Sequence, residues 1–307
     1  MGGSGSGYFS SEPESLIRQL RDSQDATAFE SYEVACNSEL YSFLSEFNAR
    51  DIQAVNKHLD EIAYALSKDQ ESLIRLNFGG SVAKRTYVEG LSDVDCLVYL
   101  ENTDLENASP QEAKNYLEQR LRERFPRTLI TQGRLAITVQ FTDCEIQLLP
   151  AKRVGDAIRI PDQSGDSWSS VVRPREFAKK LTATNAANAG KVVPVVKLAK
   201  AIIANLGDKQ KISGYHAESL AVEVFKDYQG PLTPKAMLVH YFKESATRVL
   251  APIRDSTGQS VHVDEYLGAS SSLERRIVAD AFARVERRMR MADNSQNVDD
   301  WLRLFES

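Results

Sequence analysis

A glycine-serine run followed by two closely spaced aspartates is the feature that most restricts how this chain can fold. Residues 78–98 read Phe-Gly-Gly-Ser-Val-Ala-Lys-Arg-Thr-Tyr-Val-Glu-Gly-Leu-Ser-Asp-Val-Asp-Cys-Leu-Val. Asp93 and Asp95 enter an apolar run, Asp95-Cys-Leu-Val-Tyr-Leu100, that is typical of a β-strand. Two strand residues separated by one position point to the same face. The sequence therefore predicts a tight turn followed by two carboxylates on one face of a strand.

Both halves of this feature suit a nucleoside triphosphate and a divalent metal ion. Gly80 lets the backbone approach a ligand closely, and the Ser81 hydroxyl and the N–H groups after it can donate to phosphate oxygens. The two aspartates repel each other unless a cation lies between them, and Mg²⁺ prefers oxygen ligands. By itself, each half is more often a plain turn. Their combination predicts a Mg²⁺ site, which Mn²⁺ could also occupy, next to a triphosphate.

The composition limits the kinds of partner. The net charge of −5 argues against a long nucleic-acid footprint, which usually appears as a strongly basic domain. No apolar run approaches the ~20 residues that cross a bilayer, and no basic segment precedes an apolar one at the N-terminus. We therefore expect a cytoplasmic protein without membrane contact. The three cysteines have no Cys-x-x-Cys spacing and the four histidines form no ligand pair, so no zinc site is predicted.

The hydrophobic pattern divides the chain into four parts. Residues 1–7 resemble an expression linker, and residues 8–68 have helical spacing typical of a long helix or helix pair that supports both lobes. Residues 69–172 contain strands and one crossover helix, and residues 173–307 are mostly helical. The expected fold class is α+β, with a mixed sheet and flanking helices joined to a C-terminal helical lobe.

Local signals predict individual elements of the middle part. A helix is expected over 109–124, with Ser109 at the N-cap, Pro110 in the first position and Glu112 in the third. Residues 134–141 and 145–149 are expected to pair as a hairpin that ends at Pro150, and 151–172 to be irregular. The helices predicted in the C-terminal part cover residues 174–187, 192–206, 214–228, 233–246 and 270–305.

The combined motif resembles the DNA polymerase β-like nucleotidyltransferase superfamily. Val192-Val-Pro-Val-Val-Lys-Leu-Ala-Lys-Ala-Ile202 looks like the helix that places a lysine on the triphosphate. Ile212-Ser-Gly-Tyr-His-Ala-Glu-Ser-Leu220 looks like the segment of cyclic GMP-AMP synthase and oligoadenylate synthetase in which a serine meets phosphate and a tyrosine stacks on the base. The match covers about residues 75–225, with a weaker one over 299–305. The sequence most resembles bacterial CD-NTases, the cyclic-oligonucleotide synthases of CBASS anti-phage operons.

The resemblance implies a reaction and a set of partners. Superfamily members transfer a nucleoside monophosphate from an NTP to a hydroxyl group and release pyrophosphate with Mg²⁺. The expected product is a cyclic di- or oligonucleotide second messenger that acts on a separate effector protein. A regulatory partner is compatible with this resemblance. Nothing in the sequence resembles the zinc insertion of the animal sensor, so we expect no double-stranded DNA trigger.

The resemblance also assigns roles to residues, each with a plainer alternative. Lys197 is the preferred triphosphate contact, although a solvated basic face shared with Lys200 would have the same pattern. Ser213 could donate to a phosphate or only cap the following helix. Tyr215 could stack on a base or lie in the core. His216 is expected to be a packed core histidine.

The third carboxylate of the superfamily is the point where this sequence departs from it. The expected position, just before two apolar residues and a proline, is Gln147, a neutral residue that cannot accept a proton. Glu145 lies on the same strand face and is the preferred substitute, while Asp143 lies in the turn. The alternatives are a site that uses Gln147 with water as a weak metal ligand, and a chain with weak or no catalysis.

Two other functions therefore remain open at the level of sequence. One is a terminal nucleotidyltransferase that acts on RNA or on a protein hydroxyl group, against which the acidic net charge counts modestly. The other is an NTP-binding pseudoenzyme or sensor that kept the fold and lost the third carboxylate. Gln147 is the residue on which this second alternative depends.

Overall fold

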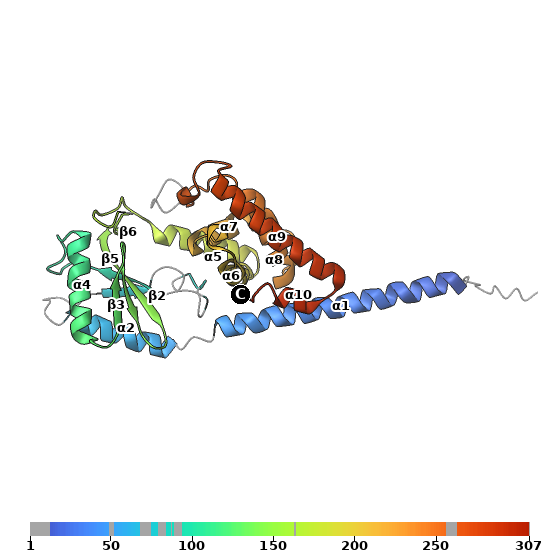
Figure 1. The fold of residues 1–307 in the computed structure, drawn as a ribbon, viewed down its shortest axis with the longest axis horizontal. Coiled ribbons are helices and arrows are strands. Elements are labelled where there is room, and N and C mark those ends of the chain that lie inside the picture. The colour runs from blue at the N-terminus through green and yellow to red at the C-terminus, as the bar shows by residue number, and fades with distance from the viewer. Residues whose placement is uncertain are drawn as a thin grey trace, which may run out of the picture.

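The molecule has a sheet-containing lobe and a helical lobe that are linked along one side by two N-terminal helices (Figure 1). The computed structural model describes residues 13–48, 52–67, 75–78, 84–86, 88, 94–162, 164–255 and 263–306. Helix α1 (Pro13–Phe47) lies along the helical lobe, and α2 (Ile52–Ser67) lies against the sheet (Figure 1). The expected α+β class with a long N-terminal helix is confirmed. Among the described helices, none is long and apolar enough to span a membrane.

The sheet is mixed, and its central pair of strands is parallel. The order is β1-β2-β5-β4-β3, with β6 paired to β5. Strands β2 and β5 are parallel, whereas the other pairings are antiparallel. The strands are β1 (Arg75–Phe78), β2 (Val94–Tyr99), β3 (Leu129–Gln132), β4 (Ile137–Gln140), β5 (Glu145–Val154) and β6 (Ala157–Arg159). The predicted strand after Asp95 and the predicted hairpin between residues 134 and 149 are both present.

The two faces of the sheet differ because side chains alternate along each strand. Cys96, Val98, Ile146 and Leu148 are fully buried in a core that also contains apolar residues of α2 and of α4 (Pro110–Arg124). Figure 1 shows these two helices beside the sheet. Residues of the opposite parity, among them Asp95, therefore lie on the other face.

Helix α4 begins as the sequence predicts. The Ser109 side chain accepts a hydrogen bond from the Glu112 backbone N–H, and the Glu112 carboxylate accepts one from the Ser109 backbone N–H. Pro110 occupies the first turn, where its missing N–H has no helical partner to lose. The hydrogen bonds to Ser109 hold the pKa of the Glu112 carboxyl below its ordinary value.

The expectation that a strand ends at Pro150 is wrong, because β5 continues to Val154. Pairing with β4 ends at Leu148, so at Pro150 no neighbour on that side requires an N–H donor. Pairing with β2 continues through Ala151, whose carbonyl oxygen accepts from the Leu100 N–H at 3.1 Å. Part of the segment 151–172 that was expected to be irregular therefore forms strand, including β6.

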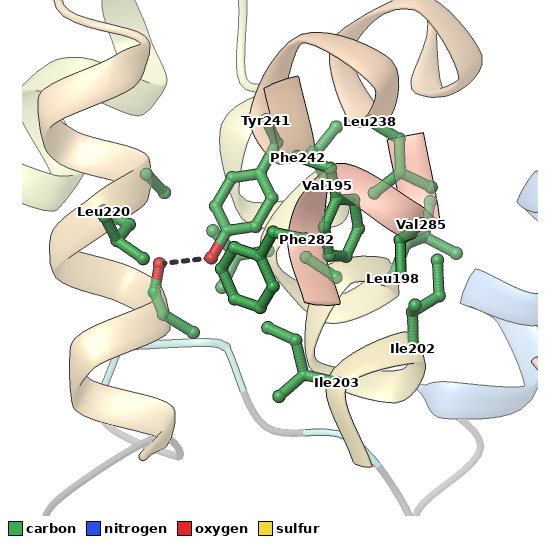
Figure 2. Packing of buried hydrophobic residues seen from close by; sticks show 14 of the residues in the cluster. Val195, Leu198, Ile202, Ile203, Leu220, Leu238, Tyr241, Phe242, Phe282 and Val285 are labelled. Atoms are coloured by element: carbon green, nitrogen blue, oxygen red, sulfur yellow. Dashed lines mark hydrogen bonds between the residues drawn. The ribbon is translucent and has the colours of Figure 1, made fainter. Parts of the chain in front are cut away.

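The helical lobe has its own core, built around α6. Its helices are α5 (Pro174–Ala187), α6 (Val192–Ala204), α7 (Gly214–Val224), α8 (Pro234–Arg248), α9 (Leu273–Ser295) and α10 (Val298–Leu302), with short 3-10 turns η1 (Asp208–Gln210) and η2 (Glu265–Leu267). Leu198 and Ile202 of α6 share this core with Tyr241 and Phe242 of α8 and with Phe282 and Val285 of α9 (Figure 2). The expected helix over 270–305 is two helices, because Gln296 adopts a left-handed conformation with φ of 50° and ends α9.

The N-terminal helices divide between the two cores. Tyr32, Cys36 and Leu40 of α1 are buried in the core of the helical lobe, whereas Ile62 and Leu66 of α2 are buried in that of the sheet. The N-terminal part of α1 extends beyond both lobes, and residues 21–31 are exposed (Figure 1). The pair of helices therefore spans the two lobes, as the helical spacing over 8–68 indicates. The proposed boundaries at 68/69 and 172/173 remain a prediction.

Replacement of Tyr241 by phenylalanine should destabilise the helical lobe modestly. Its ring meets Phe242 edge-on, with ring centroids 5.3 Å apart, and its hydroxyl donates to the Ala217 carbonyl oxygen of α7 at 3.0 Å (Figure 2). Because only this hydrogen bond is lost, we expect Tyr241→Phe to lower the free energy of unfolding by about 1 kcal/mol in urea denaturation. Tyr64→Phe, at a side chain that is 67% exposed, is the control and should leave it unchanged. Equal effects of both substitutions would contradict this assignment.

Candidate active site

The face of the sheet that points away from α2 and α4 carries Asp95. In the parallel pairing of β2 with β5, Asp95 lies directly opposite Gln147. Both side chains are partly exposed. Of the predicted metal and phosphate ligands that precede β2, Gly80, Ser81 and Asp93 lie outside the described residues. The described part of the site is therefore centred on the Asp95–Gln147 pair.

Glu145 lies one step earlier on the same face of β5. It pairs with Gln140 of β4, and the next residue, Ile146, is opposite Val94. Glu145 therefore lies outside the part of β5 that pairs with β2 and is not directly opposite Asp95. Its role as third carboxylate stays a prediction, and the register places the neutral Gln147 closest in the ladder to Asp95.

A buried group of charges joins the helical lobe to the chain just before β2. The Glu218 carboxylate of α7 accepts hydrogen bonds from Lys84, Thr86 and Lys200. Lys200 lies on α6, and its contact with Glu218 measures 2.7 Å between Nζ and Oε1. Burial by itself raises the pKa of the Glu218 carboxyl, but the two ammonium groups hold that pKa below its ordinary value. Asp95 also acts favourably on Lys200 through its charge.

Sequence reasoning singled out neither Glu218 nor Lys84, although both lie inside the segments it quoted. The only local signal was a glutamate on a helix whose neighbours Ala217 and Leu220 are apolar. Such a position is more often solvated, since Glu is rarely buried without a partner. Two of its three partners, Thr86 and Lys84, are 132 and 134 residues away along the chain.

Lys197, the predicted triphosphate contact, lies on the same helix as Lys200. It is nearly buried, and its Nζ donates a hydrogen bond to the Asn48 side chain just after α1. Burial and then the charge of Lys200 hold the pKa of Lys197 below its ordinary value. Lys197 thus lies at the junction with α1, whereas Lys200 is the lysine on which the charge of Asp95 acts. The assignment of Lys197 to the triphosphate stays a prediction.

Ser213 and Tyr215 lie at the start of α7. The Ser213 hydroxyl oxygen caps the helix by accepting from the His216 N–H at 3.2 Å, which is the capping role that the sequence left open. Ser213 is exposed, so the cap leaves its hydroxyl group accessible to a second partner such as a phosphate. The Tyr215 ring meets Phe177 edge-on with centroids 4.7 Å apart, and Lys84 lies 5.3 Å from its centroid.

His216 is a core histidine, as predicted. Its side chain is fully buried, with Nδ1 2.8 Å from the Tyr266 hydroxyl and Nε2 3.6 Å from Asp264. Asp264 in turn forms a buried ion pair with Arg275 of α9 at 2.6 Å. Burial lowers the pKa of His216 to about 4. The histidine is therefore neutral at physiological pH and suited to packing.

A second group of polar side chains lies at the turn between β4 and β5. His58 of α2 contacts both carboxylate oxygens of Asp143, at 2.9 and 3.1 Å, and stacks on Phe141. Together with Cys144, these residues bring three types of metal-ligating atom within 4.8 Å of one another. The sequence did not reveal this group, because α2 approaches this turn only in the folded chain. The direct contact with Asp143 ties α2 to the hairpin.

Comparison with known proteins defines the family. Residues 35–185 match the sequence model of the Second Messenger Oligonucleotide or Dinucleotide Synthetase domain. No curated protein matches the chain in sequence. The match includes the described sheet and the Asp95–Gln147 pair.

Solved structures with the same fold cover nearly the whole chain. CdnG from Bradyrhizobium diazoefficiens in complex with GTP has a TM-score of 0.67 and 13% identity, over 88% of this chain and 95% of that one. The CdnC:HORMA-deltaN complex of E. coli MS115-1 has a TM-score of 0.65 and 17% identity, over 87% and 92%. Vibrio cholerae DncV with a linear intermediate has a TM-score of 0.62 and 9% identity, over 97% and 89%.

The fold and the domain match together define a nucleotidyltransferase of the polymerase β-like class. Within that class, residues 35–185 match the second-messenger oligonucleotide or dinucleotide synthetase domain, and the fold is that of the bacterial CD-NTases. The resemblance found in the sequence is thereby confirmed.

The neutral state of His216 predicts how stability changes with pH. In the unfolded chain His216 binds a proton near its ordinary pKa of 6.5, whereas in the folded chain it does so only near 4. The unfolded state therefore binds more protons in this window, and the stability that His216 contributes is lost as the pH falls from about 6.5 to 4. Relative to His216→Asn, the wild type should lose about 3 kcal/mol across the window.

Urea denaturation of both proteins at several pH values between 4 and 7 would measure this difference. Titratable groups that do not interact with His216 are common to the two proteins and cancel in the comparison, so the measured difference belongs to His216 together with its neighbour Asp264. A difference in unfolding free energy that stays constant with pH would show that His216 does not titrate as its burial requires.

Proposed function

We propose that this protein is a metal-dependent synthase that makes a cyclic di- or oligonucleotide from NTPs and releases pyrophosphate. The observation that carries the proposal is Asp95 on the face of the sheet opposite α2 and α4, where its charge acts on Lys200, in a chain that matches the second-messenger synthetase domain. A carboxylate with a lysine nearby suits a site that handles both a metal ion and a triphosphate.

The metal ligands in this proposal are Asp93, Asp95 and Glu145. Asp95 and Glu145 share one face of the sheet, and their oxygen atoms are of the type that Mg²⁺ prefers. Gln147 offers one neutral oxygen beside Asp95 as a weak additional ligand. When bound, Mg²⁺ or Mn²⁺ would neutralise phosphate charge and clamp the attacking and leaving oxygens.

The other proposed residues position the nucleotide. Gly80 and Ser81 hold the β- and γ-phosphates together with Lys197 and Ser213, and Tyr215 stacks on the base, worth ~1–3 kcal/mol. A ribose hydroxyl of the acceptor nucleotide loses its proton to Glu145 and attacks the α-phosphorus. The bond from that phosphorus to the bridging oxygen breaks, and pyrophosphate leaves in line. A second round on the linear product closes the ring.

The biological setting is also part of the proposal. We place the enzyme in the cytoplasm in anti-phage signalling, where a separate effector protein responds to the product. One similar structure is a complex of CdnC with a HORMA protein, which supports a regulatory partner of that kind here. Double-stranded DNA is not proposed as a trigger.

Removal of the Asp95 charge should abolish the reaction. Asp95→Asn keeps the shape of the side chain but supplies a much weaker metal ligand, so pyrophosphate release from mixed NTPs with Mg²⁺ should fall at least about 100-fold. Asp25→Asn, on the exposed part of α1, is the matched control and should be fully active. Mass spectrometry of the wild-type products would identify the ring. Unchanged pyrophosphate release in Asp95→Asn would refute the metal assignment.

One observation favours a second candidate, an NTP-binding pseudoenzyme or sensor. The residue directly opposite Asp95 in the central strand pair is Gln147, which can neither accept a proton nor carry charge. A protein of this kind would bind NTP with Mg²⁺ and release no pyrophosphate. A terminal transferase, by contrast, would need a polymer acceptor.

Two substitutions on β5 separate these candidates. If Glu145 is the general base, Glu145→Gln should reduce pyrophosphate release by about 10²–10⁴-fold, while Gln147→Ala reduces it much less. If the chain is a pseudoenzyme, the wild type should be inactive, and Gln147→Asp should create activity. Wild-type activity that survives Glu145→Gln would exclude Glu145 as the base and leave Gln147 with water.

A further inference from the structure

Glu218 is a deeply buried carboxylate beside the described part of the candidate active site. Its side chain is 1% exposed, and it accepts hydrogen bonds from three groups that belong to two other segments. Lys84 and Thr86 follow Gly80 and Ser81 in the sequence and precede β2, and Lys200 lies on α6. One carboxylate thus holds together three parts of the chain that are distant in sequence.

The ammonium group of Lys200 makes three hydrogen bonds within this cluster. Besides Glu218, its ammonium donates to the carbonyl oxygen of Thr86 at 3.1 Å and to the hydroxyl oxygen of Thr86 at 3.3 Å. An ammonium group has three N–H donors, so all three are used within the cluster. The segment around Thr86 is therefore fixed to α6 as well as to α7.

The charges of the cluster do not balance. Two ammonium groups, on Lys84 and Lys200, face the single carboxylate of Glu218, which leaves one positive charge on this side of the lobe boundary. The negative charge of Asp95 also acts on Lys200, so the excess is fully present at the triphosphate when a metal ion neutralises Asp95. A site for a triphosphate, which is an anion, would benefit from this excess.

Lys84 also links the cluster to the predicted base-stacking residue. Its Nζ lies 5.2 Å from the centroid of Phe177 and 5.3 Å from that of Tyr215. Its side chain is 14% exposed, so the ammonium lies between Glu218 and the two rings at the edge of the site. The position of Lys84, and with it one face of the Tyr215 ring, therefore depends on Glu218.

Stability alone is a weak reason to keep such a cluster. Desolvation of buried charges largely cancels their attraction, and apolar residues of similar volume often stabilise a protein as well or better. A buried, unbalanced cluster at the boundary between the lobes, next to Asp95, is better explained by a requirement for position and charge. The same cluster connects the chain after the predicted phosphate turn to the start of α7, where Ser213 and Tyr215 lie.

We propose that Glu218 is a positioning residue of the nucleotide site: it fixes the 84–86 segment against α6 and α7 and holds Lys84 and Lys200 where their excess positive charge favours the triphosphate. The inference rests on the proposed function, because it needs an NTP as the ligand. It assigns Glu218 no contact with the reacting atoms.

The test compares charge with shape at position 218. Glu218→Gln keeps the shape and removes the charge, whereas Glu218→Asp keeps the charge and alters the packing. Binding of non-hydrolysable ATP and GTP analogues with Mg²⁺ is measured by calorimetry, with the melting temperature of each variant without ligand. We expect Glu218→Gln to weaken analogue binding about tenfold or more, and Glu218→Asp to weaken it clearly less.

A second substitution tests the route through Lys84. Lys84→Met should weaken analogue binding in the same direction, and the double variant Lys84→Met/Glu218→Gln should lose less than the sum of the two single effects, since both act on one contact. Glu33→Gln is the control, because Glu33 joins α1 to Lys235 of α8 by another ion pair. That variant should lose stability without any loss of analogue affinity.

The outcomes separate this inference from the proposed function. If the wild type binds neither analogue, the proposed function fails and this inference fails with it, before any variant is compared. If the wild type binds and Glu218→Gln binds equally well, or Glu218→Asp is as weak as Glu218→Gln, the positioning role is wrong. If Glu218→Gln does not fold, Lys84→Met decides: affinity equal to that of the wild type would overturn the proposal.

Discussion

The arrangement of the sheet-containing lobe depends on the parallel pairing of β2 with β5. Parallel neighbours need a long crossover, and α4 with the β3–β4 hairpin supplies it here. The pairing puts Cys96 and Leu148 in the core under α2 and α4, and Asp95 and Gln147 on the opposite face. A shift of one residue in this register would exchange the two sets, so packing of the core and placement of the carboxylates are fixed together.

The boundary between the two lobes is joined by charge as well as by apolar packing. Each lobe has its own core, and α1 and α2 divide between them. Glu218, Lys200 and Lys84 connect the helical lobe to the chain before β2, at the edge of the candidate site. Since directional hydrogen bonds fix distances more closely than apolar contacts do, a charged joint suits a site whose parts come from both lobes.

Local signals in the sequence predicted elements well where a few neighbouring residues decide the outcome. The capping box at Ser109 and the start of α5 at Pro174 are formed by residues in contact along the chain. The prediction failed at Pro150, where the decisive fact is that β4 no longer pairs on the proline side. Nor could it reveal the contact of His58 with Asp143, which lies 85 residues away along the chain.

The sequence by itself determined the family, the α+β class and the placement of Asp95 at the start of a strand, because motif spacing and side-chain periodicity are local properties. Only the tertiary structure decided that Gln147 lies opposite Asp95, that Lys200 rather than Lys197 acts on Asp95, and that Glu218 is buried between two lysines. Each of these depends on strand register or on helices that meet across a lobe boundary. Such contacts are set by packing over the whole chain, which no short window of sequence contains.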